Sequence, residues 1–271
     1  MGKGHVYTAK VLNKDGSIIY DEQEHETWSI LYKRQVELVK PRACEQYLKG
    51  IELLNFGPDQ IPDYREVNKN LNTLTGWGVK PVPALIPADE FFDLLANKKF
   101  PVASFIRVPE ELDYLEEPDL FHEFFGHCPL LTNKDYCGFM EKFGKLGQKL
   151  KGKERMRLFR LFWFTIEFGL IKSQNTHLIY GGGILSSKGE TVYSLEPGPI
   201  IKELEIIDCL RTPFRIDIMQ PLYFSISSFN SLFKLLDGDI NAAIKQAIEL
   251  GDHEALFEKK GKIESQSMSS C

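Results

Sequence analysis

Two histidines and one glutamate are the residues of this 271-residue chain whose types and spacing could bind a metal. His122 and His127 are two of only six histidines, and both lie in an apolar run. Glu167 is the one carboxylate of a second apolar run, residues 158–171. Two histidines and one carboxylate are the ligand set of non-heme Fe(II) oxygenases, which keep positions open for oxygen and substrate. These residues therefore favour an iron enzyme that uses oxygen.

The spacing of the two histidines bears on the kind of metal site. On an ideal α-helix, residues five apart point roughly 140° away from each other, which is poor for joint coordination. Gly126 and Pro129 are typical of a helix end, so we expect His122 on the last turn and His127 just past it. The run differs from the His-Glu-x-x-His of zinc proteases, which makes a zinc hydrolase the weaker alternative.

Glu167 needs a partner if its segment is buried. A helix that is apolar on all sides is a buried helix, and an unpaired carboxylate there is costly or becomes neutral. A metal ion is one partner, and a salt bridge with Arg107, Arg157 or Arg160 is the alternative. For the two histidines the alternative is a pair of hydrogen-bonded core residues. Glu123 is either an acid that faces the site or a solvated helix charge.

The elements that must position these residues are mostly helices. Apolar residues recur at helical spacing, which predicts helices over residues 24–40, 43–54, 64–74, 88–96, 136–149, 154–172 and 232–250, and one that starts near Pro118 and carries the histidines. Residues 100–108 fit a strand, and 179–193 fit turn-linked β structure around three glycines. That glycine run is not a phosphate loop, because no Gly-Lys-Ser/Thr follows it. The predicted fold class is mostly α with short β segments (α+β), in one catalytic domain over residues 1–271 with loose tails at about 1–20 and 259–271.

Composition and charge exclude several classes of protein. The net charge is −5 and the chain has no basic tail, so nothing points to nucleic acid or to an anionic membrane. No apolar stretch reaches the roughly 18 residues of a membrane span, and the N-terminal residues lack the apolar core of a signal peptide. We therefore expect a cytoplasmic protein. The five cysteines form no Cys-x-x-Cys pair, which favours free thiols.

Longer segments around the candidate ligands carry a family resemblance. They read PDLFHEFFGH at residues 118–127, LFWFTIEFGL at 161–170 and YGGGILSS at 180–187, with FIR at 105–107 and EELDY at 110–114 upstream. In these segments the chain resembles the pterin-dependent aromatic amino acid hydroxylases, and most closely their short bacterial phenylalanine-hydroxylating branch. The resemblance spans roughly residues 28–233.

The resemblance implies a reaction and its partners. The substrate is expected to be L-phenylalanine, hydroxylated to L-tyrosine with O2 and tetrahydrobiopterin, or a related tetrahydropterin, at a mononuclear Fe(II). No nucleic acid or membrane partner is expected, and the chain should be a monomer or dimer without the regulatory domain and C-terminal tetramerisation helix of animal relatives. Tryptophan or tyrosine hydroxylation stays open within the family. A catalytically inactive metal-binding protein is the alternative from another class.

The resemblance also assigns roles to single residues. The iron ligands and catalytic residues would be His122, His127 and Glu167. The substrate-binding residues would be Arg107, which pairs with the substrate carboxylate, Asp119, which supports that arginine, and Pro118, Trp163, Phe168 and Ser186. The pterin-binding residues would be Phe91, which stacks on the ring, Leu85, Ile86 and Glu123. A bidentate arginine suits an amino-acid carboxylate, and an aromatic face suits a planar ring.

Overall fold

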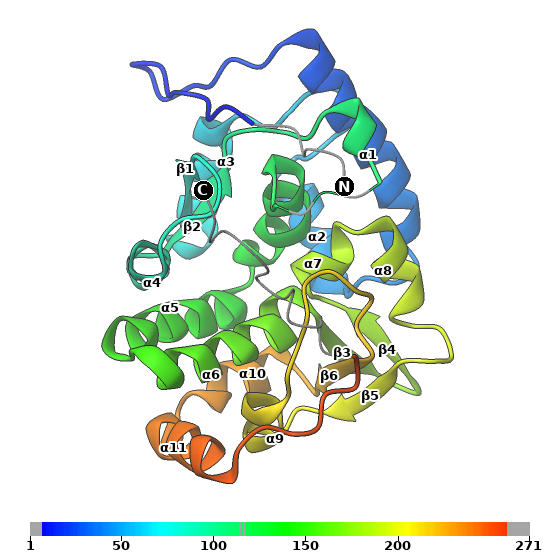
Figure 1. The fold of residues 1–271 in the computed structure, drawn as a ribbon. Coiled ribbons are helices and arrows are strands. Elements are labelled where there is room, and N and C mark those ends of the chain that lie inside the picture. The colour runs from blue at the N-terminus through cyan, green and yellow to red at the C-terminus, as the bar shows by residue number, and fades with distance from the viewer. Residues whose placement is uncertain (1–6, 114, 116, 259–271) are drawn as a thin grey trace, which may run out of the picture.

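The helical periodicity of the N-terminal part produces four helices and one small parallel sheet (Figure 1). In the computed structural model, which describes residues 7–113, 115 and 117–258, the helices are α1 (Glu22–Val39), α2 (Glu45–Leu53), α3 (Tyr64–Thr75) and α4 (Ala88–Ala96). Strand β1 (Gly78–Val82) pairs in parallel with β2 (Lys99–Ala103). Asp21 starts α1 with a capping box, because it and Glu24 accept each other's backbone N–H groups.

The central segment carries two short π-helical turns. They are η2 (His122–His127) and η4 (Trp163–Glu167). Between them lie the 3₁₀ turn η3 (Cys128–Thr132) and the helices α5 (Lys134–Lys149) and α6 (Gly152–Phe162), and a further 3₁₀ turn, η1 (Pro109–Glu111), precedes them. Both candidate ligand segments are therefore locally distorted helices rather than regular ones.

A mixed sheet forms in the C-terminal part of the chain, and the second π-helical turn leads directly into the first of its strands. Its strands are β3 (Gly169–Ser173), β4 (Thr176–Ile179), β5 (Ile200–Glu203) and β6 (Leu222–Ile226), in the order β4-β3-β6-β5. β3 and β4 are antiparallel, whereas β6 is parallel to both β3 and β5. The remaining helices are α7 (Gly182–Leu185), α8 (Lys188–Tyr193), α9 (Ile206–Arg211), α10 (Phe229–Leu235) and α11 (Ile240–Leu250).

An aromatic core holds the first π-helical turn from behind. Phe121, Phe124 and Phe125 are all buried. Trp28 of α1 meets Phe121 edge-on with ring centroids 5.5 Å apart, and Phe121 stacks on Phe125 at 4.9 Å. Tyr47 of α2 donates its hydroxyl to the carbonyl of Phe125 at 2.7 Å. Burial of each such ring contributes about 1.5–3 kcal/mol, so the histidine-bearing turn rests on a rigid support.

The predicted α+β class is confirmed, as are the helices over residues 24–40, 43–54, 64–74, 88–96 and 136–149 with small shifts of their ends. The predicted helix over 154–172 is wrong at its C-terminal end, because α6 ends at Phe162 and β3 begins at Gly169. Gly169 packs against Tyr180 and the carbonyl of Thr165 so closely that a Cβ atom would collide with both. That approach lets the chain turn directly into a buried strand.

Three further predictions of elements need correction. Residues 179–193 contain the helices α7 and α8 instead of β structure, since Ser187 caps α8 by accepting from the backbone N–H of Glu190 at 3.2 Å. The strand predicted over 100–108 ends at Ala103. The single helix over 232–250 is two helices, because the side chain of Asp239 caps a new start by accepting from Ala242 N at 2.9 Å.

The N-terminal residues 7–20 form no helix or strand but are bonded to Ser104, the residue that follows β2. The backbone N–H of Lys10 donates to Ser104 Oγ at 3.0 Å, and the Tyr20 hydroxyl donates to the Ser104 carbonyl at 3.1 Å. Tyr114, the last residue of the segment at 110–114, lies outside the described residues. So do residues 259–271, which were predicted to form a loose tail. Within the described ranges, no helix combines the length and the apolar character that a bilayer crossing requires.

Candidate metal centre and its cavity

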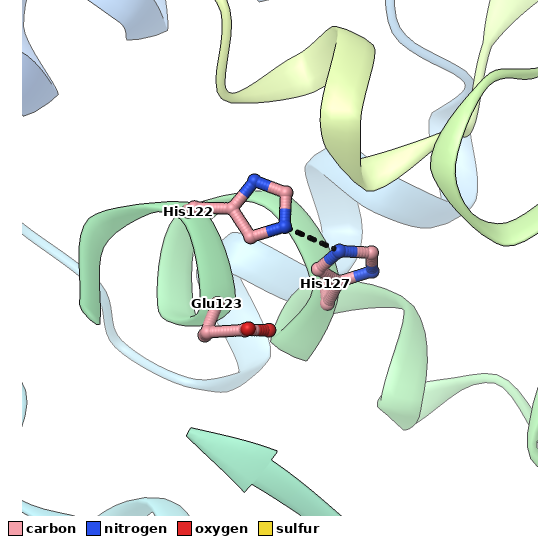
Figure 2. Close-up of side chains that lie close together, drawn as sticks. All are labelled: His122, Glu123 and His127. Carbon is pink, nitrogen blue, oxygen red and sulfur yellow. Dashed lines mark hydrogen bonds between the residues drawn. The ribbon is translucent and has the colours of Figure 1, made fainter. Parts of the chain in front are cut away.

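A π-helical turn brings His122 and His127 to one face. The backbone N–H of Cys128 bonds to the carbonyl of Glu123, five residues back. The wider turn of such a helix places residues five apart nearly above one another. The two Nε2 atoms lie 3.1 Å apart, and Figure 2 shows these ring nitrogens pointing toward each other. The prediction that His127 lies past a helix end is therefore wrong, although the convergence it was meant to explain is present.

Glu167 reaches the same point from the second π-helical turn. There the backbone N–H of Phe168 donates to the carbonyl of Trp163, again five residues back, at 2.8 Å. The carboxylate oxygens of Glu167 lie 3.3 Å from His127 Nε2 and 3.7 Å from His122 Nε2. A cation bonded at about 2.0–2.2 Å to nitrogen and oxygen donors fits between three atoms so spaced. The donor set is that of the non-heme iron oxygenases.

A second carboxylate, that of Glu123, faces the same histidines (Figure 2). One ligand atom from each of His122, Glu123 and His127 lies within 4.8 Å of the others. Burial and the nearby charge of Glu167 raise the pKa of Glu123 well above its usual value. Burial also raises the pKa of Glu167, but His127 and His122 more than offset this and lower it. Of the two carboxyl groups beside the histidines, Glu167 is therefore the easier to ionise and Glu123 the harder.

A salt bridge with arginine, the alternative partner for Glu167, is wrong for all three candidates in the described part of the chain. Arg157 and Arg160 pair with Asp252, the latter at 2.9 Å. Arg107 pairs with Asp119 at 2.8 Å. The only cationic or basic groups within ion-pair distance of Glu167 among the described residues are the two histidines.

Ser186 fixes the tautomer of His122. Its Oγ lies 2.8 Å from the carbonyl of Gly182 and 2.9 Å from His122 Nδ1. A carbonyl only accepts, so the single hydroxyl proton goes to Gly182 and the serine oxygen accepts from Nδ1–H. His122 Nε2 is then left with its lone pair facing Glu167 and His127, as a metal ligand requires. Burial lowers the pKa of His122 to about 4, which keeps the ring neutral.

The glycine run at 181–183 makes room for the ligands, a role that the sequence analysis missed. A Cβ atom on Gly182 would collide with the ring of His127, and one on Gly183 would lie 2.9 Å from Glu167 Oε2. A Cβ atom on Gly126 would lie 2.5 Å from the carbonyl of Gly182. Helix α7 therefore packs directly against both π-helical turns. Three successive glycines without a phosphate-binding continuation were the available signal.

A cavity of about 470 Å³ opens beside the candidate ligands. Among its lining residues are His122 and Glu167 and five of the six residues predicted to bind substrate, namely Arg107, Pro118, Trp163, Phe168 and Ser186. The sixth, Asp119, lies fully buried behind Arg107. It accepts from Arg107 Nε at 2.8 Å, from Nη2 at 2.9 Å and from the arginine's backbone N–H at 3.0 Å. The guanidinium carries five N–H donors, so this pair orients it and leaves donors for a ligand.

Part of the cavity lining was not predicted. It includes residues 216–219 of a segment between α9 and β6, residues 215–219, which we call the strap, and also Arg34 and Lys188. Residues 215–218 alternate between charged residues and isoleucine as a strand does, yet they form no strand, so the sequence does not show their position. Trp163, another lining residue, lies between Phe168 and Phe214, with ring centroids 4.5 Å from each.

The residues predicted to bind the pterin do not line this cavity. Leu85 is 72 % exposed in the segment before α4. Phe91 is half-buried and meets Phe162 edge-on at 5.3 Å. Ile86 is also half-buried, and of the four only Glu123 lies beside the histidines. The structure therefore does not bring this set together around one described cavity.

The chain matches a known protein family and individual members of it. Residues 7–250 match the model of the biopterin-dependent aromatic amino acid hydroxylase family. The chain is 51 % identical over 254 residues to the phenylalanine-4-hydroxylase of Pseudomonas aeruginosa, covering 94 % of this chain and 97 % of that one.

Solved structures agree with the sequence comparison. The apo structure of the cold-active phenylalanine hydroxylase from Colwellia psychrerythraea 34H matches with a TM-score of 0.90 and 47 % identity, over 92 % of this chain and 97 % of that one. The Chromobacterium violaceum phenylalanine hydroxylase with bound iron(III) and oxidised 7,8-dihydrobiopterin matches with a TM-score of 0.82 and 42 % identity, over 86 % and 85 %. The region that matches the family model, residues 7–250, includes both π-helical turns and the strap.

Proposed function

The chain belongs to the biopterin-dependent aromatic amino acid hydroxylases, and we propose that the two π-helical turns and the cavity beside them are its active site. It hydroxylates L-phenylalanine to L-tyrosine with O2 and a tetrahydropterin at a mononuclear non-heme iron. The observation that carries the site assignment is the convergence of His122, His127 and Glu167 at one end of a cavity that also contains Arg107.

His122, His127 and Glu167 would hold the iron through two imidazole Nε2 atoms and one carboxylate. Iron held there would activate O2, with the tetrahydropterin as the two-electron donor, for insertion of one oxygen atom into the aromatic ring. The chain keeps the ligands ready for this: Ser186 holds His122 in the metal-binding tautomer, and the ionised Glu167 balances part of the metal charge. Three protein ligands leave coordination positions open.

Arg107 would bind the carboxylate of phenylalanine at the far side of the cavity. Its bidentate pair with the buried Asp119 holds the guanidinium plane in place before substrate arrives. Pro118, Trp163 and Phe168 would hold the aromatic ring between that anchor and the iron. Fixing both ends of the substrate orients the ring carbon that reacts and removes an entropic barrier to the reaction.

Glu123 would face the pterin as an uncharged acid. Its raised pKa favours this, because a protonated carboxyl can both donate and accept hydrogen bonds to a polar ring. Phe91, Leu85 and Ile86 stay predictions as pterin contacts, supported by the family resemblance. The monomeric or dimeric state and the cytoplasmic location also stay predictions.

The test is oxygen uptake with product analysis on iron-loaded protein given a tetrahydropterin and L-phenylalanine. We expect tyrosine from the natural chain and none from Glu167→Ala, while the exposed-site variant Glu196→Ala should retain full activity. L-tryptophan and L-tyrosine, compared as kcat/KM, separate the alternatives within the family. Undiminished tyrosine formation by Glu167→Ala would contradict the assigned iron site.

A further inference from the structure

Gln220 is a buried amide that joins two segments that line the cavity. It is 2 % exposed. Its Oε1 accepts from the indole Nε1–H of Trp163 at 3.2 Å, while its Nε2 donates to the carbonyls of Arg215 at 2.8 Å and Ile218 at 2.9 Å. An indole N–H only donates and a carbonyl only accepts, so these partners fix the orientation of the amide. The amide thus uses its carbonyl and both N–H groups.

The backbone of Gln220 is fixed as firmly as its side chain. Its N–H donates to Glu190 Oε1 at 3.0 Å, and the Tyr223 hydroxyl donates to the same oxygen. Glu190 is a buried residue of α8, and Tyr223 is a buried residue of β6. The amide is therefore anchored to both elements and cannot shift without breaking buried hydrogen bonds.

The two groups joined by Gln220 both line the substrate cavity. Trp163 begins the π-helical turn that ends in Glu167 and packs against Phe168. The strap contributes Ile216, Ile218 and Met219 to the lining of the same cavity. Gln220 itself is not among the residues that line this cavity.

Apolar burial fixes the strap only weakly, because Ile216 is 61 % exposed and Met219 is 47 % exposed. Polar contacts therefore carry much of its attachment. The Arg215 guanidinium donates to the carbonyl of Glu258 at 2.9 Å, and the two hydrogen bonds from Gln220 tie the backbone of Arg215 and Ile218 to the body of the domain.

We propose that Gln220 is a positioning residue that holds Trp163 and the strap together, and so shapes the part of the cavity that they line and its preference for a phenyl ring over the larger indole of tryptophan. The proposal rests on the proposed function, in which this cavity binds the amino acid. Gln220 acts through Trp163 and the strap and does not touch the substrate.

The decisive variants are Gln220→Glu and Gln220→Met. Glutamate has the same shape but turns an oxygen toward two carbonyls, and methionine has similar length without hydrogen bonds. We expect the KM for L-phenylalanine to rise roughly tenfold or more, as loss of two buried hydrogen bonds predicts. The kcat should change much less, and the kcat/KM ratio of phenylalanine to tryptophan should fall. Co(II) affinity should stay at the wild-type value, because no ligand is disturbed.

Asn68→Asp is the matched control for an amide-to-carboxylate change. Asn68 Nδ2 donates to the carbonyl of Val79 at 3.2 Å and its Oδ1 accepts from Val79 N at 2.8 Å, in the α3–β1 contact and away from the residues of the cavity. This variant should leave the KM and the substrate preference unchanged even if it lowers the melting temperature.

A double-mutant cycle tests whether Gln220 acts through the indole. Trp163→Phe removes the N–H donor, so in that background Gln220→Met should raise the KM for phenylalanine by a smaller factor than it does alone. If both Gln220 variants fold and keep the wild-type KM and substrate preference, the proposal is overturned. Arg107→Ala separates failure of the positioning role from failure of the proposed function. If Arg107→Ala raises the KM for phenylalanine while the Gln220 variants leave it unchanged, only the positioning role is overturned. If Arg107→Ala leaves this KM unchanged, the assignment of the cavity is overturned.

Discussion

The hydroxyl of Ser186 controls which nitrogen of His122 is available to the metal. We expect Ser186→Ala to weaken Co(II) or Fe(II) binding by roughly 10–100-fold, because partners that orient ligand histidines typically contribute that much. Metal titration followed by absorption spectroscopy measures this. Ser194→Ala is the control, since Ser194 is also buried but its Oγ has no hydrogen-bond partner within the described part of the chain. Equal metal affinity in both variants would remove the role given to Ser186.

Gly182 offers a second test at the residue scale. Alanine there should displace the ring of His127, since the added Cβ has no room. Metal affinity should fall sharply and the protein should lose about 1–3 kcal/mol of stability, as is usual for overpacking. Gly57→Ala serves as the comparison, because nothing lies within 4 Å of its added Cβ and its φ is not positive. Metal titration and urea unfolding of both variants measure the two effects.

His122 gives the metal-free chain a dependence of stability on pH. Burial lowers its folded pKa to about 4, below the usual value of 6.5. The unfolded chain therefore takes up a proton first as the pH falls, and the stability contributed by the neutral ring is present above pH 6.5 and is lost progressively between about 6.5 and 4. Urea unfolding across this range measures it, and His122→Gln should flatten that part of the profile. A profile of the same slope in the variant would assign the effect to other groups.

At the scale of elements, regular helices were predictable and the two π-helical turns were not. The apolar residues of α4 recur at helical spacing, and its predicted bounds match the observed ones. An i, i+5 pair instead conflicts with regular helical geometry, and the sequence could not show that one wider turn resolves the conflict. Likewise Gly169-Leu170-Ile171 is apolar enough for a helix or a buried strand, and only pairing with β4 and β6 decides.

The same division applies to the candidate site. Residues with distinctive chemistry, such as His122 and Glu167, could be found from their types and surroundings, whereas the role of Arg107 came from the family resemblance. Gln220 and the strap could not, because their role depends on which distant segments the fold brings together. Gly182 was visible as part of a glycine run, but its function of admitting the His127 ring is a matter of three-dimensional approach.

The break between α10 and α11 can be tested at the scale of elements. Asp239 caps α11 and is placed at its start. Asp239→Ala should lower the free energy of unfolding by about 1 kcal/mol, a typical cost of losing an N-cap, and should leave the KM for phenylalanine unchanged because Asp239 is not part of the cavity. Urea unfolding and steady-state kinetics measure both. An altered KM would mean that α11 influences the cavity.

For the whole molecule, the candidate metal centre joins the two parts of the fold. His122 and His127 lie on the turn supported by α1 and α2, and Glu167 lies on the turn that leads into the mixed sheet. Metal binding should therefore stabilise the entire chain, by about 2.7 kcal/mol at a free metal concentration of 100 times the Kd. Thermal unfolding with and without Co(II) measures this. Glu167→Ala should show little of the increase, and an equal increase in that variant would place the stabilising metal elsewhere.

The order of the mixed sheet has a consequence for how the chain is made on the ribosome. β6 lies between β3 and β5 although it is the last of the strands to be synthesised. When β3 and β4 leave the ribosome, one edge of β3 has no strand to pair with, and unpaired edges are sites of aggregation. The strap directly precedes β6, so the nascent chain completes the sheet and closes the cavity wall almost at the same moment, well after all three candidate ligands have emerged.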